Sequence, residues 1–329
     1  DSRILDYVYY FLGSRAGQAA AIGLDNGSAQ PNLSVRLLSE IKLLLPSERD
    51  IERITEILSA LDDKIELNRQ TNETLEAMAQ ALFRDWFVDF GPTCAKMEAR
   101  EPYLAPDLWA LFPDRLDEET GLPVGWGREP IYDQAEWING AAYKNMHFSD
   151  APDALPVVKI AELKAGVTAN TKFTNTQLGE KYFIDSGELL FSWSGNPDTS
   201  IDAFVWQHGP AWLNQHIFAV RENGRLGKAH IYTMLKAYMP EFTEIARNKQ
   251  TTGLGHVTKA DMQRMMVCIG SPAIREQFGE IINPIFGKLV ANLFENRELA
   301  ATRDLLLPKL ISGEIRLRDT EKVVEGAVA

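Results

Sequence analysis

The sequence has few of the residues that build covalent or metal-bound scaffolds, with two cysteines and five histidines among 329 residues. Cys94 and Cys268 lie far apart, there is no Cys-x-x-Cys pair, and the histidines are scattered. Neither a disulfide framework nor a zinc cluster is therefore supported, and each cysteine is expected to be a small apolar filler.

Long apolar runs are also missing. No segment approaches the roughly 18 to 20 continuous apolar residues that a membrane span needs. The N-terminus lacks a basic region followed by an apolar core, which is the pattern of a secretory signal. We therefore expect a cytoplasmic protein with no membrane partner.

Catalytic motifs are equally scarce. The sequence has no Gly-x-x-x-x-Gly-Lys loop, no acidic trio of the nuclease type, and no nucleophile with an obvious base. Asn283-Pro284-Ile285-Phe286 superficially resembles the Asn-Pro-Pro-Phe tetrapeptide of adenine methyltransferases, but it lacks the second proline and has no Gly-rich loop upstream. An enzymatic interpretation rests on this imitation alone, so we predict no catalytic residue, cofactor or metal on this chain.

Basic residues do not predominate, since 34 Lys and Arg face 46 Asp and Glu, for a formal charge of −12. That balance argues against a nucleic-acid partner, because phosphate contacts come from Lys and Arg. Residues 123–272, however, hold 14 Lys and Arg against 15 Asp and Glu. The acidity is mainly in residues 47–90 and 98–119, so a nearly neutral central region stays available for binding DNA.

What the sequence does contain is a helical pattern that occurs twice. Apolar residues recur at 3,4 spacing over 51–86, and the same spacing returns over 278–310. Polar residues interrupt the two runs at matching places, 224 positions apart: Asn68 and Asn72, then Asn292 and Asn296. One such run could be ordinary core packing of a long helix. Two runs in register predict an antiparallel intramolecular coiled coil whose asparagines fix the register.

The repeat extends beyond these helices. Residues 7–12 match 231–235 as helix-like segments, and 41–45 match 265–269 as strand-like runs, each followed by a turn and the long helix. Two positions depart from the pattern. Arg303 breaks the second apolar seam, and Pro284 is expected to kink or restart the second helix.

The region between the repeats predicts an α+β domain of mixed strands and helices. Strand candidates are 157–160, 181–184, 189–193, 203–206 and 216–220. The first copy is not preceded by such strands, so residues 1–46 are expected to be the end of a domain whose body is missing. Residues 91–122 are acidic and proline-containing, which predicts a connector with little regular structure. The apolar cluster 108–112 within it is expected to pack against a domain.

Polar loop segments within this domain are the candidates for contacting DNA. Asn and Gln can pair with adenine in the major groove, whereas Lys, Ser, Thr and backbone amides suit phosphates. Turn chemistry is the alternative explanation for all of them, and Trp193 is expected to be packed rather than stacked on a base. We expect Lys249 on a phosphate and Gln250 or His256 nearer the bases. The candidates are Asn139, Tyr143, Lys144, Ser192, Ser194, Asn196, Asn214, Gln215, Lys249, Gln250, Thr251, Thr252 and His256.

Four segments carry a family resemblance. Residues 54–70 (ITEILSALDDKIELNRQ), continuing to 82–87 (LFRDWF), closely resemble the central conserved region of the specificity subunits of type I restriction-modification systems. Residues 121–126 (GLPVGW) look like the entry to the second target-recognition domain of that family, and 308–315 (PKLISGEI) look like its C-terminal ending. The departure is the absence of most of the first target-recognition domain.

The resemblance implies a protein of defence against foreign DNA. Two recognition domains each read half of a bipartite site in double-stranded DNA, and two antiparallel helices set the gap between the halves. The helices also dock modification subunits, which carry S-adenosylmethionine, and restriction subunits join that core. The specificity subunit performs no chemistry. A rival interpretation is a truncated subunit that reads no DNA and acts as a scaffold or competitor for modification subunits.

The same resemblance assigns domain boundaries. We expect a remnant of the first recognition domain at 1–46, spacer helices at 47–90 and 273–315, the connector at 91–122, a complete second recognition domain at 123–272, and a tail at 316–329.

Overall fold

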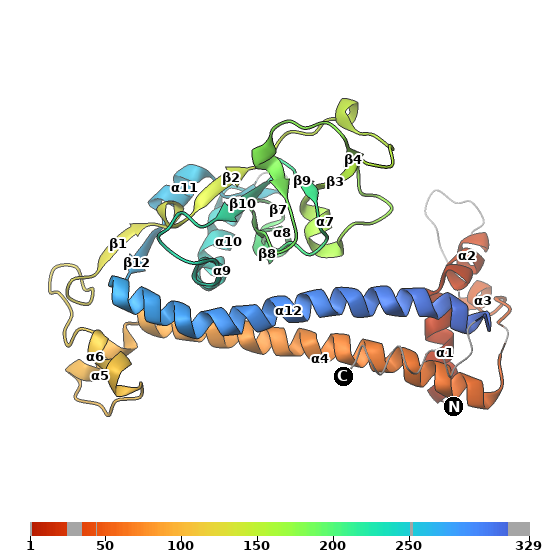
Figure 1. Cartoon of the computed structure of the whole chain (residues 1–329), viewed down its shortest axis with the longest axis horizontal. Coiled ribbons are helices and arrows are strands. Elements are labelled where there is room, and N and C mark those ends of the chain that lie inside the picture. Colours follow the sequence, from red (N-terminus) through yellow and green to blue (C-terminus); the bar gives the residue numbers. More distant parts are fainter. Residues whose placement is uncertain (1, 25–34, 44, 251–252, 315–329) are drawn as a thin grey trace. The chain divides into compact units, whose positions relative to one another are not determined.

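A computed structural model describes residues 2–24, 35–43, 45–250 and 253–314 (Figure 1). The chain divides into two compact units: unit 1 contains residues 1–72 and 291–329, and unit 2 contains residues 73–290. Two 40-residue helices, α4 (Glu48–Phe87) and α12 (Pro272–Ile311), each contribute to both units. Among the described residues, no helix combines the length and the apolarity that crossing a bilayer requires.

Local chemistry explains where α4 and α12 begin and end. The Ser47 hydroxyl accepts a hydrogen bond from the backbone N–H of Asp50 (3.2 Å), and Glu48 and Asp50 place negative charge in the first turn of α4. Proline opens α12 at its first position, where no N–H is needed. Gly313 follows its end with φ +72°, a conformation that favours glycine. Pro284 does not interrupt α12, so the expected restart there is wrong.

Unit 1 is a helical assembly. Helices α1 (Ser2–Gly13), α2 (Arg15–Gly23) and α3 (Val35–Leu38) precede α4. The 3,4-spaced apolar residues of α4 and α12 form its core together with α1, as the spacing predicts. The buried members are Tyr7, Tyr10, Ile51, Ile54, Ile57, Leu58, Leu61, Leu299, Leu306, Leu307 and Leu310.

Unit 2 holds all the strands that the described residues contain. Two four-stranded sheets have the orders β2-β10-β6-β8 and β4-β3-β9-β5, and two strand pairs, β1-β12 and β11-β7, accompany them. The strand bounds are β1 Gly127–Pro130, β2 Glu136–Asn139, β3 Leu155–Val158, β4 Phe173–Thr174, β5 Phe183–Ile184, β6 Leu189–Ser192, β7 Ser194–Gly195, β8 Asp202–Val205, β9 Ala211–Leu213, β10 Ile217–Arg221, β11 Gly255–His256 and β12 Met266–Ile269.

Unit 2 also contains short helices. The α-helices are α5 Gly91–Met97, α6 Pro106–Leu111, α7 Ile160–Ala165, α8 Pro197–Ser200, α9 Lys228–Ala237, α10 Met239–Asn248 and α11 Lys259–Arg264. Three short 3₁₀ helices are η1 Ile131–Gln134, η2 Asn145–His147 and η3 Glu180–Tyr182.

An aromatic cluster joins the long helices to α9 within unit 2. Phe278 of α12 packs against Trp86 and Phe87 of α4, with ring centroids 5.5 and 5.0 Å apart. His230 of α9 lies 4.6 Å from the Phe278 ring and is 5% exposed. Aromatic pairs of this kind add about 0.5 to 1.5 kcal/mol each beyond the area they bury.

The α+β class is confirmed, and each of the five expected strands exists at least in part. The strand expected at 41–45 is wrong for Ile41–Leu43 and Leu45, which form no regular element; Leu44 lies outside the described residues. Its counterpart β12 pairs with β1, whereas the described residues of unit 1 offer no strand as a partner.

The connector is more ordered than expected, because α5 and α6 form within it. Phe112 of its apolar cluster packs against α4, since it is 3% exposed and its ring lies 5.0 Å from that of Trp86.

Candidate nucleic-acid interface

The order of the strands brings the predicted polar segments to one end of a sheet. Strand β10 is antiparallel to both β2 and β6, so β2 and β6 finish where β10 begins. The register places Asn139 and Phe191 opposite Phe218, and Ser192 opposite Ile217. Residues 139–144, 193–196 and 214–216 therefore share one end of the sheet, which we call the polar end.

Backbone hydrogen bonds hold these segments together. Gly140 N–H donates to Ile217 O (3.0 Å), and Gln215 N–H donates to Ala141 O (3.0 Å). Only glycine fits at position 140, because an added Cβ would lie 2.2 Å from Asn214 O. The short pair β7-β11 adds the fourth predicted segment by placing His256 opposite Ser194.

Trp193 organises the exposed side chains of the polar end. Its indole N–H donates to the Asn139 amide oxygen (2.9 Å), and its ring lies 5.5 Å from that of His216. The Gln215 side-chain amide nitrogen is 3.3 Å from His216 Nε2. The half-buried Trp193 thus packs against His216, as expected for a packed residue, and its hydrogen bond orients the Asn139 amide. Two amides beside a flat aromatic surface match the chemistry of base edges.

The predicted residues differ in how they are placed. Asn139, Lys144, Asn196, Gln215 and Gln250 are exposed, Ser194, Lys249 and His256 are half-buried, and Tyr143, Ser192 and Asn214 are buried. Thr251 and Thr252 lie outside the described residues. Ser192 belongs to a central strand with every side chain buried, and Tyr143 packs with Trp212 in a core cluster. These two therefore offer no accessible polar atom to a duplex.

Lys249 already has a partner. Its ammonium forms an ion pair with Asp261, whose side chain is 8% exposed. Burial acts to raise the pKa of Asp261, but hydrogen bonds from Lys249 and Thr258 outweigh it and leave the pKa below its usual value. The Asp261 carboxylate also completes the capping box of α11 with Thr258. A phosphate would have to compete with this ion pair, so Lys144 is the more available cation of the polar end.

The four spacer asparagines lie in unit 1 and meet in pairs. The Asn68 amide donates to Asn296 Oδ1 (2.9 Å) and to Glu295 Oε2 (2.8 Å). The Asn292 amide donates to Asn72 Oδ1 (2.8 Å), and the Asn296 amide donates to the backbone of α4 at 3.2 Å. Residue numbers rise along α4 as they fall along α12, so the two helices are antiparallel.

A charged contact beside these pairs explains the break at Arg303. Its guanidinium binds Asp62 Oδ1 (2.6 Å), and the Tyr10 hydroxyl donates to Asp62 Oδ2 (2.8 Å). Burial, and then the bond to Asp62, raise the pKa of Tyr10. The break at Arg303 was visible in the sequence, but its partner Asp62 was not predicted. A charged residue on an apolar seam indicates an opposite charge on the facing helix.

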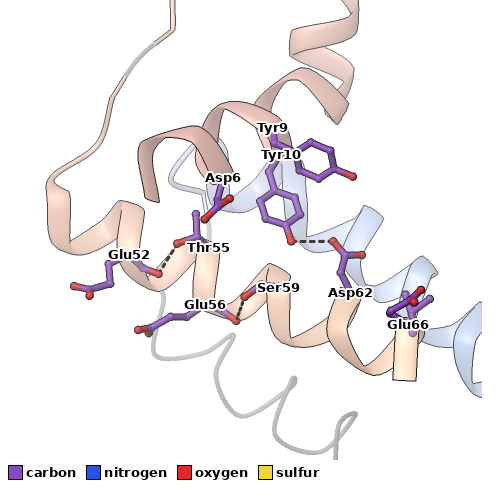
Figure 2. Close-up of a pocket in the computed structure, with 10 residues that line it drawn as sticks. Asp6, Tyr9, Tyr10, Glu52, Thr55, Glu56, Ser59, Asp62 and Glu66 are labelled. Carbon is purple, nitrogen blue, oxygen red and sulfur yellow. Dashed lines mark hydrogen bonds between the residues drawn. The ribbon is translucent and has the colours of Figure 1, made fainter. Parts of the chain in front are cut away.

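Tyr10 and Asp62 also line a groove of about 680 Å³ between α1 and α4. Figure 2 shows their hydrogen bond in this groove, with the carboxylates of Asp6, Glu52 and Glu56 around it. Glu66 and Tyr9 also line the groove, and Tyr9 is 70% exposed. The groove is an acidic surface because carboxylates form much of its lining. Within the described ranges, no group of three or more His, Cys, Asp or Glu could hold a metal ion.

Comparisons with known proteins identify sequences similar to this chain. Residues 3–77 match the family model of the type I restriction modification DNA specificity domain. The type I restriction enzyme MjaIX specificity subunit of Methanocaldococcus jannaschii is 26% identical over 327 residues, which cover 97% of this chain and 71% of that protein. The HindI specificity subunit of Haemophilus influenzae is 26% identical over 333 residues, with 87% and 71% covered.

A solved structure supports the same fold. The crystal structure of a type I restriction-modification S subunit from M. genitalium aligns with a TM-score of 0.50 and 16% identity, over 93% of this chain and 72% of that one. The sequence matches thus make the chain similar to the specificity subunits of type I restriction enzymes, and the structural likeness shows that it shares the fold of an S subunit.

Proposed function

We propose that this chain reads DNA for a type I restriction-modification complex and performs no catalysis itself. The polar end of unit 2 reads one half of a bipartite site, the pair α4 and α12 sets the gap, and the same helices dock modification subunits that bring S-adenosylmethionine. Restriction subunits join this assembly. The observation that carries the proposal is the convergence of four polar segments at one end of a sheet.

The accessible side chains divide by role. Asn139 and Gln215 are exposed amides, which suit base edges, while Lys144 is an exposed cation that suits a phosphate. The charge of residues 123–272 also fits better than that of the whole chain, because the acidic excess belongs mainly to the first spacer helix and the connector. Asn283 of the weak methyltransferase-like tetrapeptide lies exposed within α12 rather than in a loop that follows a strand, which supports a subunit without chemistry.

Selection from a random duplex pool tests the proposal. The chain is assembled with modification subunits and S-adenosylmethionine, and the bound duplexes are sequenced. We expect an enriched sequence, and Asn139→Ala or Gln215→Ala should cost about 1 to 3 kcal/mol on that sequence only. Lys144→Ala should weaken binding on every sequence and reduce the salt slope by about 1.

Lys228→Ala is the matched control. Lys228 is also an exposed lysine of unit 2, but its ammonium donates to Gly187 O (3.1 Å) at the opposite end of the sheet. Equal losses for Lys144→Ala and Lys228→Ala, or a wild-type complex that enriches no sequence, would contradict the assignment.

The acidic groove of unit 1 favours a second candidate function, that of a scaffold for protein partners. Carboxylates from α1 and α4 beside the exposed Tyr9 fit a basic protein segment rather than DNA. Glu52→Lys with Glu56→Lys should therefore slow assembly with modification subunits and weaken its salt dependence, as measured by surface plasmon resonance. Glu40→Lys with Glu298→Lys, which makes the same charge change at exposed ion pairs of unit 1 outside the groove, is the control. If the double variant assembles as the wild type does, the groove is not the docking surface.

A further inference from the structure

Helix α9 lies between α4 and the sheet β2-β10-β6-β8, and three kinds of contact connect it to α4. The Arg84 guanidinium donates to Ala237 O at the end of α9 (2.8 Å). The Phe83 ring lies 6.0 Å from that of His230. The Tyr232 hydroxyl donates to the Glu76 carboxylate. On its other side, α9 contacts β8, the last strand of the sheet.

A half-buried lysine connects both sides of α9. Lys236 Nζ lies 2.9 Å from Asp202 Oδ1 on β8 and 3.4 Å from Glu76 Oε1 on α4, and its side chain is 13% exposed. Tyr232 stacks beside it, with Nζ 5.7 Å from the ring centroid. Glu76, Lys236, Tyr232 and Asp202 are therefore one cluster, which we call the α9 joint.

The α9 joint reaches the polar end directly. Asp202 is the first residue of β8, and the register places it opposite Ser192, the last residue of β6. The segment 193–196 begins at the next residue. A shift of Asp202 would therefore move the end of β6, where Trp193 holds the Asn139 amide.

Ionic contacts with little exposure are directional, whereas apolar contacts tolerate sliding. Burial acts to lower the pKa of Lys236, but the Asp202 and Glu76 carboxylates outweigh burial and leave it raised, so the lysine stays charged. Removing the ammonium would remove the counter-charge that the Glu76 and Asp202 carboxylates share, and they would then repel each other.

We propose that Lys236 and Glu76 are positioning residues that fix the orientation of the polar end on α4 without touching DNA. Their role in DNA reading rests on the proposed function, because the polar end is the surface they orient. If α4 sets the gap of a bipartite site, these two residues keep the polar end at a fixed position relative to α4, and so at a fixed distance from the other half-site.

Distances within the folded protein test the proposal. Spin labels are attached through a genetically encoded keto amino acid at Ala77 on α4 and at Gln215 on the polar end, both exposed, so that Cys94 and Cys268 stay native. Pulsed electron resonance on the full chain should give one narrow distance distribution for the wild type. Lys236→Met, which keeps the length of the side chain, should broaden that distribution and shift its maximum.

Matched variants separate positioning from plain stability. Lys236→Arg keeps the charge and should restore the narrow distribution. Glu76→Gln should broaden it less than Lys236→Met does, because Tyr232 can still donate to the amide oxygen. Glu66→Gln makes the same charge change on α4 at an exposed pair with Arg69 and should have no effect. All distances are measured well below the melting temperature of each variant.

Two outcomes are decisive. A narrow, unshifted distribution in Lys236→Met overturns the proposal, even if that variant melts earlier. A broadened distribution supports it. If the wild-type complex then selects no sequence from random duplexes, the proposed function fails while the positioning role within unit 2 stands. If it selects one, Lys236→Met should lose affinity for the selected duplex without changing which bases are selected.

Discussion

Lowering the pH from 6.5 towards 4 should destabilise unit 2, and replacing His230 with phenylalanine should remove most of that dependence. His230 is 5% exposed, and it lies among the rings of Phe83, Phe87 and Phe278. Burial in this apolar cluster, and then the nearby Arg275 charge, lower its pKa from 6.5 to about 3.

The direction follows from proton linkage. Below pH 6.5 the unfolded chain binds a proton at His230, while the folded protein does not until about pH 3. The unfolded state therefore gains protons first, and stability falls as pH decreases through this window, by up to ~1.4 kcal/mol per pH unit. Above pH 6.5 the contribution is fully present and does not change. Asp261, whose pKa is lowered from 3.8, adds its own loss only below about that pH.

Urea unfolding at pH 7, 6, 5 and 4 measures the effect. All seven tryptophans belong to residues 73–290, so tryptophan fluorescence reports on unit 2. The difference between wild type and His230→Phe isolates this histidine, because the other titrating groups are common to both proteins. His256→Asn, a histidine outside the aromatic cluster, is the control. Parallel pH profiles for wild type and His230→Phe would show that His230 is not the cause.

Periodic features of this fold were predictable from sequence, because they depend on local spacing. The 3,4 pattern over 51–86 and 278–310 predicts two long helices, and the structure has them at Glu48–Phe87 and Pro272–Ile311. The asparagines interrupt the apolar seam at the same places in both helices. Their side-chain amides can therefore form hydrogen bonds across the two helices in one register.

The polar end was predictable only as separate segments. That residues 139–144, 193–196 and 214–216 lie together depends on the strand order β2-β10-β6-β8, which no spacing in the sequence encodes. The polar character of a segment also does not predict which of its side chains are exposed. Ser192 and Tyr143 belong to polar segments, yet the strand and the core cluster that contain them bury both side chains. The ion pair of Lys249 was not predictable either. Its partner Asp261 is held in place by the capping box of α11.

Replacing Asn68, Asn72, Asn292 and Asn296 together with leucine should raise the melting temperature of unit 1 and loosen the register of its helices. Asn68 is 4% exposed and Asn292 is fully buried, and Asn292 Oδ1 has no hydrogen-bond partner among the described residues. Each buried amide is therefore costly, and four leucines would extend the apolar seam without that cost.

A single substitution should act in the opposite direction. Asn68→Leu removes the donor to Asn296 Oδ1 and to Glu295 Oε2 and leaves the Asn296 oxygen without that partner, at a cost of about 1 to 3 kcal/mol. The asparagines are thus coupled, and the quadruple variant should be more stable than the sum of single variants predicts. Thermal unfolding followed by circular dichroism at 222 nm measures both changes.

Register is measured independently by zero-length carbodiimide cross-linking. Lys64 Nζ and Glu295 Oε1 are 3.4 Å apart across α4 and α12, so the wild type should yield that cross-link, identified by mass spectrometry. With four leucines, a slipped pairing no longer places an amide beside an apolar side chain, so slipped registers lose their penalty. The Lys64–Glu295 product should then decrease, while new cross-links or higher oligomers appear. A quadruple variant that melts below the wild type and keeps the full yield of that product would mean that the asparagines supply strength rather than register.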